Sequence, residues 1–264
     1  LEEPEIQNIG KITTEIEGKI TFENVSYTYE DTNIQALDNI SFTINKGETV
    51  AIMGKTGSGK STILSLLTRI HDVTGNSKIK IDGHNLTEYD LYHLRNSMSI
   101  VPQDPFLFSD SIKNNIKFGK EDATDEEIIT AAKMAVVDDN IQSFTNKYET
   151  ILGERGITLS GGQKQRVSIA RAIIKEAPIL ILDDCLSAVD TETEEKIVNN
   201  FKKIFNKKTT IIVTHRASAA KNANKIIVLD SGRIVQEDTH NQLVNQEGFY
   251  KDLYTKQLSE KENA

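Results

Sequence analysis

Alternation of apolar and polar residues marks the first part of the chain. Residues 20–29 and 37–44 carry apolar side chains at roughly every second position, which is typical of half-buried antiparallel strands. A third stretch, 78–81, predicts one more strand that closes in the turn pair Asp82-Gly83. The pattern therefore predicts a first lobe that is partly antiparallel β.

Nearly continuous apolar runs predict a second set of strands. Residues 48–53, 178–182 and 209–214 are apolar or β-branched at most positions, and the last two have the composition of parallel strands covered on both faces. We also expect a strand within 100–108 that ends in a proline-bracketed loop, and a hairpin with a Ser-Gly turn over 226–235. Helical patterns cover residues 62–67, 86–95, 111–116, 125–136, 138–144, 164–174 and 249–259. Together these elements indicate an α/β fold.

The loop between residues 53 and 62 carries the strongest chemical signal. Glycines let the backbone curl so that several N–H groups point at one anion, and the start of a helix adds partial positive charge. In such a loop Lys60 reaches the β- and γ-phosphates and the Ser61 hydroxyl holds Mg²⁺. The alternative is a glycine-rich turn that contains Lys-Ser by chance. The segment matches the phosphate-binding pattern G-x-x-x-x-G-K-[ST] and consists of Gly54, Lys55, Thr56, Gly57, Ser58, Gly59, Lys60, Ser61 and Thr62.

Ionisable residues stand at the ends of two predicted core strands. Ligands of parallel sheets bind at the carboxyl ends of the strands, so Asp183 is placed to hold Mg²⁺ through its water shell and Asp184 to orient a water molecule. His215 is the one histidine that ends a predicted core strand. The alternative for the two acids is capping of a following helix.

A second glycine pair precedes the predicted helix 164–174. Adjacent glycines before a helix create an N-terminal site for an anion. A simple glycine-serine helix cap is the alternative for this segment taken alone. The segment follows Leu159 and consists of Ser160, Gly161, Gly162 and Gln163.

Composition narrows the class of protein. A chain of 264 residues with 38% hydrophobic and 27% charged residues is typical of a soluble globular protein with one or two domains. No apolar run approaches the roughly 18 residues that span a bilayer. The single cysteine, Cys185, excludes an internal disulfide and suits a reducing compartment. The net charge of −8 argues against nucleic acid as the main partner. Residues 1–18 are acidic with few apolar positions, which predicts a linker or a strap.

In this order the segments resemble the nucleotide-binding domain of ATP-binding cassette (ABC) transporters, and most closely the exporter branch. The resemblance covers about residues 19–255, and the segment 159–163 between the two Walker motifs is highly specific. It implies a P-loop NTPase with a RecA-like core, an antiparallel β subdomain and a helical insertion at about residues 90–165. It also implies that residues 1–18 are a linker from a transmembrane domain and that 19–264 form the ATP-binding domain.

The resemblance assigns roles to individual residues, with ATP and Mg²⁺ as cofactors. Tyr29 would stack on adenine, Gln103 would sense Mg²⁺ and the membrane domain, and His215 would be the switch histidine. Mg²⁺ would be held by Ser61, Gln103 and Asp183, and catalysis would use Asp184, His215 and Gln103. The family needs two such domains head to tail, so Ser160 to Gln163 would complete the phosphate site of a partner. The remaining family segments are the Walker A loop 54–62, the Walker B strand 179–183, the D-loop 187–190, and the stretches 104–108 and 153–156, which contact coupling helices.

One residue departs from the family pattern. The family has a glutamate that polarises the attacking water where this chain has Asp184. We therefore expect the motor domain of an exporter at the cytoplasmic face of the membrane, with its own site weakened and with a different cassette as partner. A homodimer whose backbone shifts to let the aspartate reach is the alternative assembly. Other functions that stay open are a regulatory ATP-binding module with little turnover and a soluble ABC ATPase of DNA repair or translation; the latter needs a coiled-coil insertion or tandem cassettes, which these 264 residues do not contain.

Overall fold

A computed structural model describes residues 6–153, 159–187, 189–205 and 208–262 of the chain. Its first sheet has four strands in the order β2-β1-β4-β5, and all its pairs are antiparallel. Ile20 lies opposite Ile44 on one side and opposite Ile81 on the other. The predicted antiparallel lobe is therefore present. Its strands are β1 (Ile20–Thr28), β2 (Gln35–Ile44), β4 (Lys78–Ile81) and β5 (His84–Asn85).

The second sheet has six strands in the order β10-β9-β3-β8-β7-β6. Its pairs are parallel except at the edge, where β10 returns antiparallel to β9 through Ser231 and Gly232, which have φ of 49° and 77°. Two positive φ values in a two-residue turn match the twist of a hairpin. Every residue of β3 and β8 is buried, which explains their uninterrupted apolar and β-branched sequence. The strands are β3 (Thr49–Gly54), β6 (Met98–Val101), β7 (Ile179–Asp183), β8 (Thr209–Val213), β9 (Lys225–Asp230) and β10 (Arg233–Asp238).

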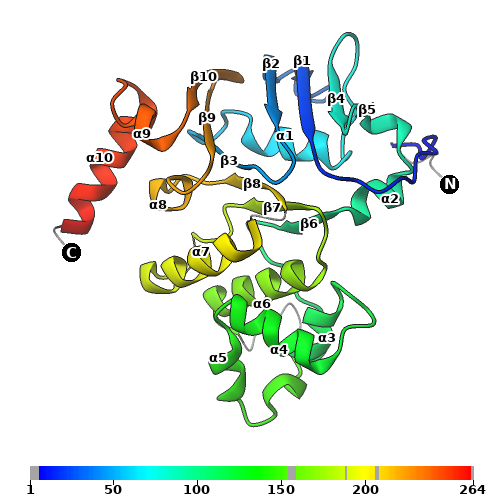
Figure 1. Cartoon of the computed structure of the whole chain (residues 1–264), viewed down its shortest axis with the longest axis vertical. Helices are drawn as coiled ribbons and strands as arrows, with labels where there is room; N and C mark the ends of the chain where they lie inside the picture. Colours follow the sequence, from blue (N-terminus) through cyan, green and yellow to red (C-terminus); the bar gives the residue numbers. More distant parts are fainter. Residues whose placement is uncertain (1–5, 154–158, 188, 206–207, 263–264) are drawn as a thin grey trace.

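The helices fall into groups around these sheets. In Figure 1, α3, α4, α5 and α6 gather below the six-stranded sheet, α1 lies among the upper strands, and α10 extends to one side. No helix in the described part of the chain is long and apolar enough to cross a membrane. The helices are α1 (Lys60–Leu67), η1 (Leu86–Glu88), α2 (Leu91–Asn96), α3 (Ile112–Lys117), α4 (Asp125–Met134), α5 (Asp138–Gln142), η2 (Lys147–Glu149), α6 (Gly161–Ile174), α7 (Thr191–Phe205), α8 (Ala217–Ala220), α9 (His240–Leu243) and α10 (Phe249–Glu262).

Two predicted helices differ from the structure, and a third helix was not predicted. The expected helix 86–95 is split into η1 and α2, because Tyr89 is extended and the Asp90 side chain caps α2 by accepting the His93 N–H at 2.8 Å. The helix expected at 164–174 begins at Gly161, so the glycine pair forms its first turn and does not precede it. Helix α7 was not predicted; its buried Ile197 and Phe201 are four residues apart and face one side.

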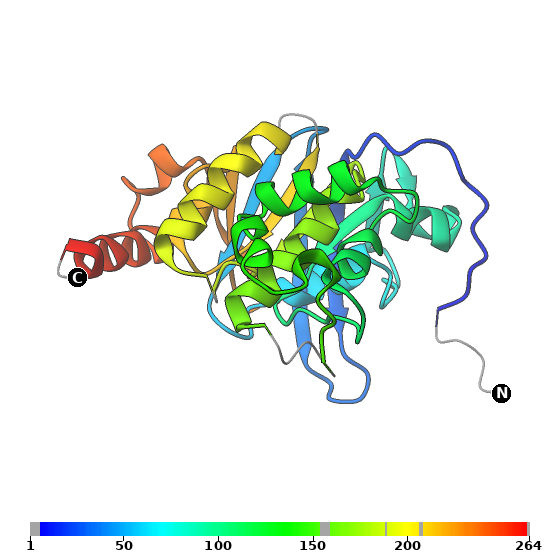
Figure 2. The same cartoon turned by 90° about the horizontal axis from the view of Figure 1, so that it is seen from below.

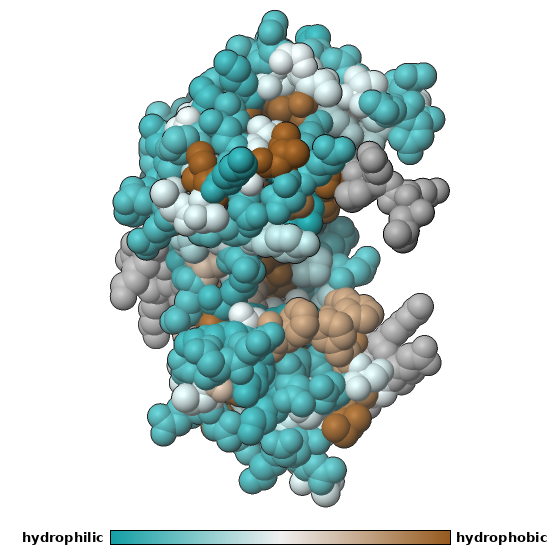
Figure 3. Space-filling view, turned by 90° about the vertical axis from the view of Figure 1, so that its right-hand side faces the viewer, coloured by the Kyte–Doolittle hydropathy of each residue, from teal (hydrophilic) through white to brown (hydrophobic). Residues whose placement is uncertain are grey.

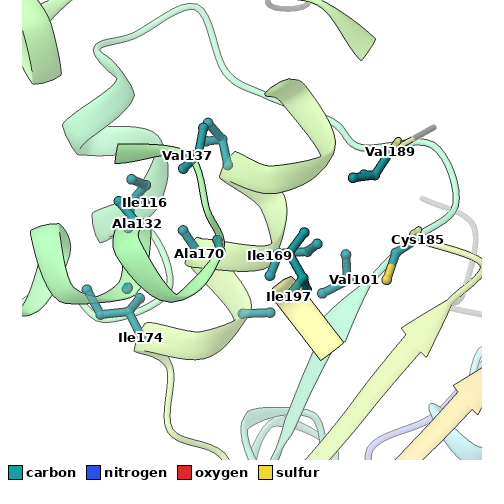
Figure 4. Close-up of a cluster of buried hydrophobic side chains, with 14 of the residues drawn as sticks. Val101, Ile116, Ala132, Val137, Ile169, Ala170, Ile174, Cys185, Val189 and Ile197 are labelled. Atoms are coloured by element: carbon teal, nitrogen blue, oxygen red, sulfur yellow. The ribbon is translucent and has the colours of Figure 1, made fainter. Parts of the chain in front are cut away.

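The cores lie on both sides of the six-stranded sheet. One cluster joins the two sheets around α1, with Phe22, Leu67 and Ile181 among its members. A second cluster lies beneath the sheet, where Ile169 and Ala170 of α6 contact the layer that includes Val101, Ile116, Ala132 and Ile197 (Figure 4). Because α6 packs at once against β6 and against α3 and α4, its N-terminal end has a fixed place relative to the sheet.

The N-terminal segment is a strap against the surface. Asn8 donates to the Asp90 carboxylate at 2.8 Å and accepts the Leu91 N–H at 2.7 Å. The Asp82 carboxylate accepts the N–H groups of Glu17 at 2.7 Å and Lys19 at 2.8 Å. Figure 2 shows the segment running along the outside of the molecule. Residues 6–18 are therefore a bound strap, whereas their origin in a transmembrane domain stays a prediction.

Candidate functional site

The loop between β3 and α1 is built on three glycines with positive φ. Gly54, Gly57 and Gly59 have φ of 146°, 79° and 104°, a region that L side chains rarely adopt. A Cβ at Gly54 would lie 2.2 Å from the Leu229 carbonyl oxygen, and one at Gly59 would lie 2.5 Å from the Ala36 carbonyl oxygen. At Gly57 a Cβ would meet nothing within 4 Å. The loop is thus tightly packed behind and open in front, as a cradle for an anion requires.

Lys60 lies within this loop. Its Nζ donates to the carbonyl oxygens of Gly54 and Lys55, both at 2.8 Å. Burial lowers the pKa of the Lys60 ammonium, against the raising effect of the Asp184 and Asp183 charges. A half-buried cation with carboxylates near it is stabilised by an anionic ligand, since the ligand supplies the counter-charge that solvent cannot.

Two carboxylates and a histidine stand at the carboxyl ends of β7 and β8. Asp183 ends β7, and the Asp184 N–H donates to the Val213 carbonyl at 2.8 Å. Burial, with a smaller effect of the neighbouring Asp184 charge, raises the pKa of Asp183. Burial also raises the pKa of Asp184, opposed by His215 and Arg216. His215 Nδ1 lies 2.9 Å from Asp184 Oδ1, so the histidine contacts one of the two acids.

These groups surround one pocket of about 690 Å³. This volume is in the range of sites that take small molecules. Most of the predicted phosphate, metal and catalytic residues line it: Gly54, Lys55, Thr56, Gly57, Lys60, Ser61, Gln103, Asp183, Asp184 and His215. The remaining lining residues come from the strand end, Val213 and Thr214, and from α10, Phe249 and Leu253. Sequence reasoning missed the two α10 residues, because an aromatic and a leucine in a polar helix carry no signal for a pocket wall.

The pocket offers oxygen donors suited to Mg²⁺. Ser61, Gln103 and Asp183 supply a hydroxyl, an amide and a carboxylate to the same space. In the described part of the chain no three His, Cys, Asp or Glu side chains gather into a metal cluster. A cation here would therefore depend on a few protein oxygens together with ligand phosphates and water, which is how Mg²⁺ is usually held.

Tyr29 lies outside this pocket. Its hydroxyl is 3.1 Å from the Thr62 Oγ1 in the first turn of α1, and its ring meets Tyr27 edge-on at 5.1 Å between centroids. Ser58 of the phosphate loop is also absent from the pocket lining, because its side chain is buried. Tyr29 is thus attached to the helix that follows the phosphate loop, and its contact with a base stays a prediction.

The predicted segment 160–163 also lies apart from the pocket. Ser160 and Gln163 form a capping box: the Gln163 N–H donates to Ser160 Oγ at 3.3 Å, and the Ser160 N–H donates to Gln163 Oε1 at 2.9 Å. Gly161 is exposed, and a Cβ there would meet nothing within 4 Å. The helix-cap alternative is therefore correct as local structure, and the space beside Gly161 at the N-terminus of α6 is open. Residues 154–158, with most of the predicted stretch 153–156, lie outside the described residues.

Two side chains connect the pocket to neighbouring segments. Gln165 in α6 is buried and donates to the Pro102 carbonyl at 3.0 Å, just before Gln103. Arg216 donates to the Ser187 carbonyl at 3.0 Å and pairs with the buried Glu194 of α7. The loop that carries Gln103 is thus joined to α6, and the segment after His215 is joined to residues 187 and 194.

Comparison with known proteins shows which family has this arrangement. Residues 37–187 match the model of the ABC transporter family. The chain belongs to this family. A relative in Bacillus subtilis named as a multidrug export ATP-binding/permease protein, YgaD, is 47% identical over 241 residues, which are 91% of this chain and 41% of the relative. A Staphylococcus aureus protein with the same kind of name is 45% identical over 256 residues, 96% of this chain and 44% of that protein.

The comparison with solved structures also finds an ABC exporter. The structure of a bacterial Atm1-family ABC exporter with ATP bound matches with a TM-score of 0.88 and 38% identity, over 94% of this chain and 43% of that one. The chain thus spans less than half the length of the relatives it matches. The predicted fold class and the assignment as an ABC-type ATPase domain similar to those of exporters are confirmed.

Proposed function

We propose that this chain is the ATP-binding and ATP-hydrolysing motor domain of a membrane exporter and works at the cytoplasmic face of the membrane. The observation that carries the proposal is the single pocket in which the phosphate loop, the Asp183-Asp184 pair, Gln103 and His215 meet. The similar Atm1-family exporter has ATP bound, and the two bacterial relatives are named for multidrug export, which supports the proposal. The chain's own residues fit the same chemistry.

Each group has a part in binding or hydrolysis. The loop N–H groups and the Lys60 ammonium bind the β- and γ-phosphates, and Tyr29 stacks on the adenine. Mg²⁺, held by Ser61, Gln103 and Asp183, would neutralise the charge on the phosphates. Asp184 orients the attacking water. His215 contacts the Asp184 carboxylate, keeps it in place, and lies on the side of the pocket where the γ-phosphate binds.

A partner cassette completes the site. Phosphate binding at the Ser160 to Gln163 end of α6 requires a ligand from outside, because these residues do not line this chain's own pocket. Head-to-tail pairing of two cassettes brings the segment onto the partner's ATP. We favour a second, different cassette, because Asp184 weakens this chain's site while Ser160 to Gln163 keep the family pattern.

An aromatic surface suits the contact with the membrane domain. Phe106, Phe108 and Phe118 are 58%, 38% and 65% exposed, and the Arg171 guanidinium lies 5.4 Å from the Phe108 ring centre and 5.7 Å from that of Phe118. Burial lowers the pKa of Arg171 to about 10. Figure 3 shows apolar side chains exposed on the face turned toward the viewer, including a group in the lower half beside the hollow. Such a surface next to the Gln103 loop fits a coupling helix.

A regulatory ATP-binding module with little turnover is the second candidate, and Asp184 favours it. One experiment separates the two. Purified chain is given Mg²⁺-ATP under conditions that allow two cassettes to pair, and phosphate release is compared with that of the Lys60→Ala variant. Release above the Lys60→Ala level supports a motor domain. Tight ATP binding with release equal to that of the variant supports the regulatory module, and the absence of ATP binding contradicts both.

A further inference from the structure

One face of α10 is directed at the pocket and at the segment that carries His215. Phe249, Leu253 and Gln257 are spaced by four residues, so they lie along one side of the helix. The first two line the pocket. Gln257, one turn further on, contacts the backbone next to His215. One side of α10 therefore faces both the pocket and the backbone at His215.

The Gln257 amide holds that backbone with two hydrogen bonds. Its Oε1 accepts the Ala217 N–H at 2.8 Å, and its Nε2 donates to the His215 carbonyl at 3.0 Å. The orientation of the amide is fixed by its partners, because the N–H needs an acceptor and the carbonyl needs a donor. One planar group thus fixes the chain on both sides of Arg216, at the start of α8.

The helix that carries this amide is itself anchored on the core. Tyr250 is fully buried, and its hydroxyl lies 2.7 Å from His240 Nδ1. It belongs to a cluster with Met53 of β3, the strand that leads into the phosphate loop, and with Ala220 of α8. Gln257 therefore belongs to a helix that packs against β3, the strand before the phosphate loop. Its hydrogen bonds hold the His215 backbone relative to that strand.

We propose that Gln257 is a positioning residue for His215. The inference rests on the proposed function, in which His215 acts in ATP hydrolysis. The contact of 2.9 Å between His215 Nδ1 and Asp184 Oδ1 depends on where the His215 backbone lies, and the Gln257 amide holds that backbone through the His215 carbonyl and the Ala217 N–H. Gln257 does not line the pocket, so its removal should change catalysis and leave ATP binding intact.

The kinetic test compares three variants of the full 264-residue chain with the unchanged chain, under conditions that allow two cassettes to pair. Gln257→Ala removes both bonds. Gln257→Glu keeps the acceptor for the Ala217 N–H but at neutral pH has no donor for the His215 carbonyl. Thr255→Ala is the matched control on an exposed position of the same helix. We expect kcat to fall on the order of 10-fold in both Gln257 variants, because a misplacement near 1 Å costs about 10²-fold and a loosened loop samples the correct position part of the time. The KM for ATP should stay within about twofold, and Thr255→Ala should match the unchanged chain.

A spectroscopic test follows the histidine without nucleotide. In two-dimensional ¹H–¹⁵N spectra, the imidazole resonances of His215 should move in both Gln257 variants and stay in place in Thr255→Ala. A fall in kcat with unmoved His215 resonances would overturn the proposal, as would wild-type kcat in Gln257→Glu. The His215→Ala variant separates this inference from the function on which it rests. If that variant keeps full turnover, the role of His215 is wrong; if it loses turnover while both Gln257 variants keep theirs, only the role of Gln257 is wrong.

Discussion

His215 Nδ1 lies 2.9 Å from Asp184 Oδ1, and the two residues are held by adjacent parallel strands. The Asp184 side chain is 15% exposed and that of His215 is 56% exposed, so the contact runs from the interior of the pocket to its mouth. Asp184 has a φ of 44°, and its N–H is bonded to the Val213 carbonyl. The position of the acid is thus set by the backbone, which leaves side-chain length as the variable that decides its reach.

Lengthening this side chain should raise turnover. Aspartate is one methylene shorter than glutamate, about 1.5 Å of reach. A misplacement near 1 Å of a group that orients a reactant costs on the order of 10²-fold in rate, or about 2.7 kcal/mol of barrier. We expect Asp184→Glu to increase ATPase turnover by roughly 10- to 100-fold under conditions that allow two cassettes to pair, measured as phosphate release.

The control for this variant is Asp184→Asn, which keeps the length and removes the charge. It should hydrolyse no faster than the unchanged chain. A purified homodimer of the unchanged chain that hydrolyses ATP as fast as the Asp184→Glu variant would contradict both the weakened site and the need for a different partner cassette.

Removing the Lys60 ammonium should abolish measurable ATP binding. The ammonium is half buried in the loop, where a charged contact to phosphate is worth more than a neutral hydrogen bond. We expect Lys60→Ala to weaken ATP by about 100-fold or more in isothermal titration with Mg²⁺. The exposed Lys78→Ala on β4 serves as the control and should bind normally. Equal affinity of the two variants would remove the assignment of the phosphate loop.

Tyr29 should contribute to binding of the base and not of the phosphates. Loss of one aromatic stack costs roughly 1–3 kcal/mol. Tyr29→Ala should therefore weaken ATP by that amount and leave pyrophosphate affinity unchanged in the same titration. Tyr92→Ala, at an exposed position of α2, is the aromatic control and should bind both ligands normally. If the Tyr29 variant loses both ligands equally, the ring supports α1 and does not contact adenine.

The ionised Asp183 side chain should lower the free energy of unfolding of the chain without nucleotide. Because the pKa of Asp183 is raised from its ordinary value of 3.8, the folded chain disfavours the charged form. At low pH the Asp183 side chain is protonated and does not oppose folding. The free energy of unfolding falls as pH rises from 3.8 through the raised pKa of Asp183 in the folded chain. Asp183→Asn should increase the melting temperature at pH 7, with a gain below about 1 kcal/mol because solvent screens the part-exposed carboxylate.

Two measurements check this sign. The difference in melting temperature between Asp183→Asn and the unchanged chain should shrink as pH falls through the raised pKa of Asp183 and below its ordinary value of 3.8, where the acid becomes protonated in both the folded and the unfolded chain. With Mg²⁺-ATP the order should reverse, because the variant lacks a ligand for Mg²⁺. A less stable Asp183→Asn at pH 7 without nucleotide would show that the carboxylate is stabilising and that its burial is not the dominant effect.

The sequence predicted the parts of this molecule that local chemistry determines. Gly54 to Ser61 and the pair Asp183-Asp184 could be placed because a strand followed by a glycine-rich loop has few alternatives. Phe249, Leu253 and Gln257 could not, since their roles depend on α10 returning to the pocket from more than 30 residues beyond His215. Likewise, the break at Tyr89 accompanies a contact with β4, in which its hydroxyl donates to the Ile81 carbonyl at 2.9 Å, and helical spacing does not reveal that contact.

The Gln165 side chain has a consequence for how two sites in a paired assembly are linked. Its bond to the Pro102 carbonyl joins the loop of Gln103, which lines this chain's own pocket, to α6, whose Ser160 end faces a partner's ligand in the proposed dimer. Any ligand that moves one of these segments must either carry the other with it or break this hydrogen bond. Thermodynamic linkage then requires the effect to be mutual: if nucleotide in this pocket changes the affinity at the partner's pocket, nucleotide there changes the affinity here by the same factor. In a pair of cassettes with unequal turnover, ATP held in the slow site would therefore change the affinity of the fast site for ATP.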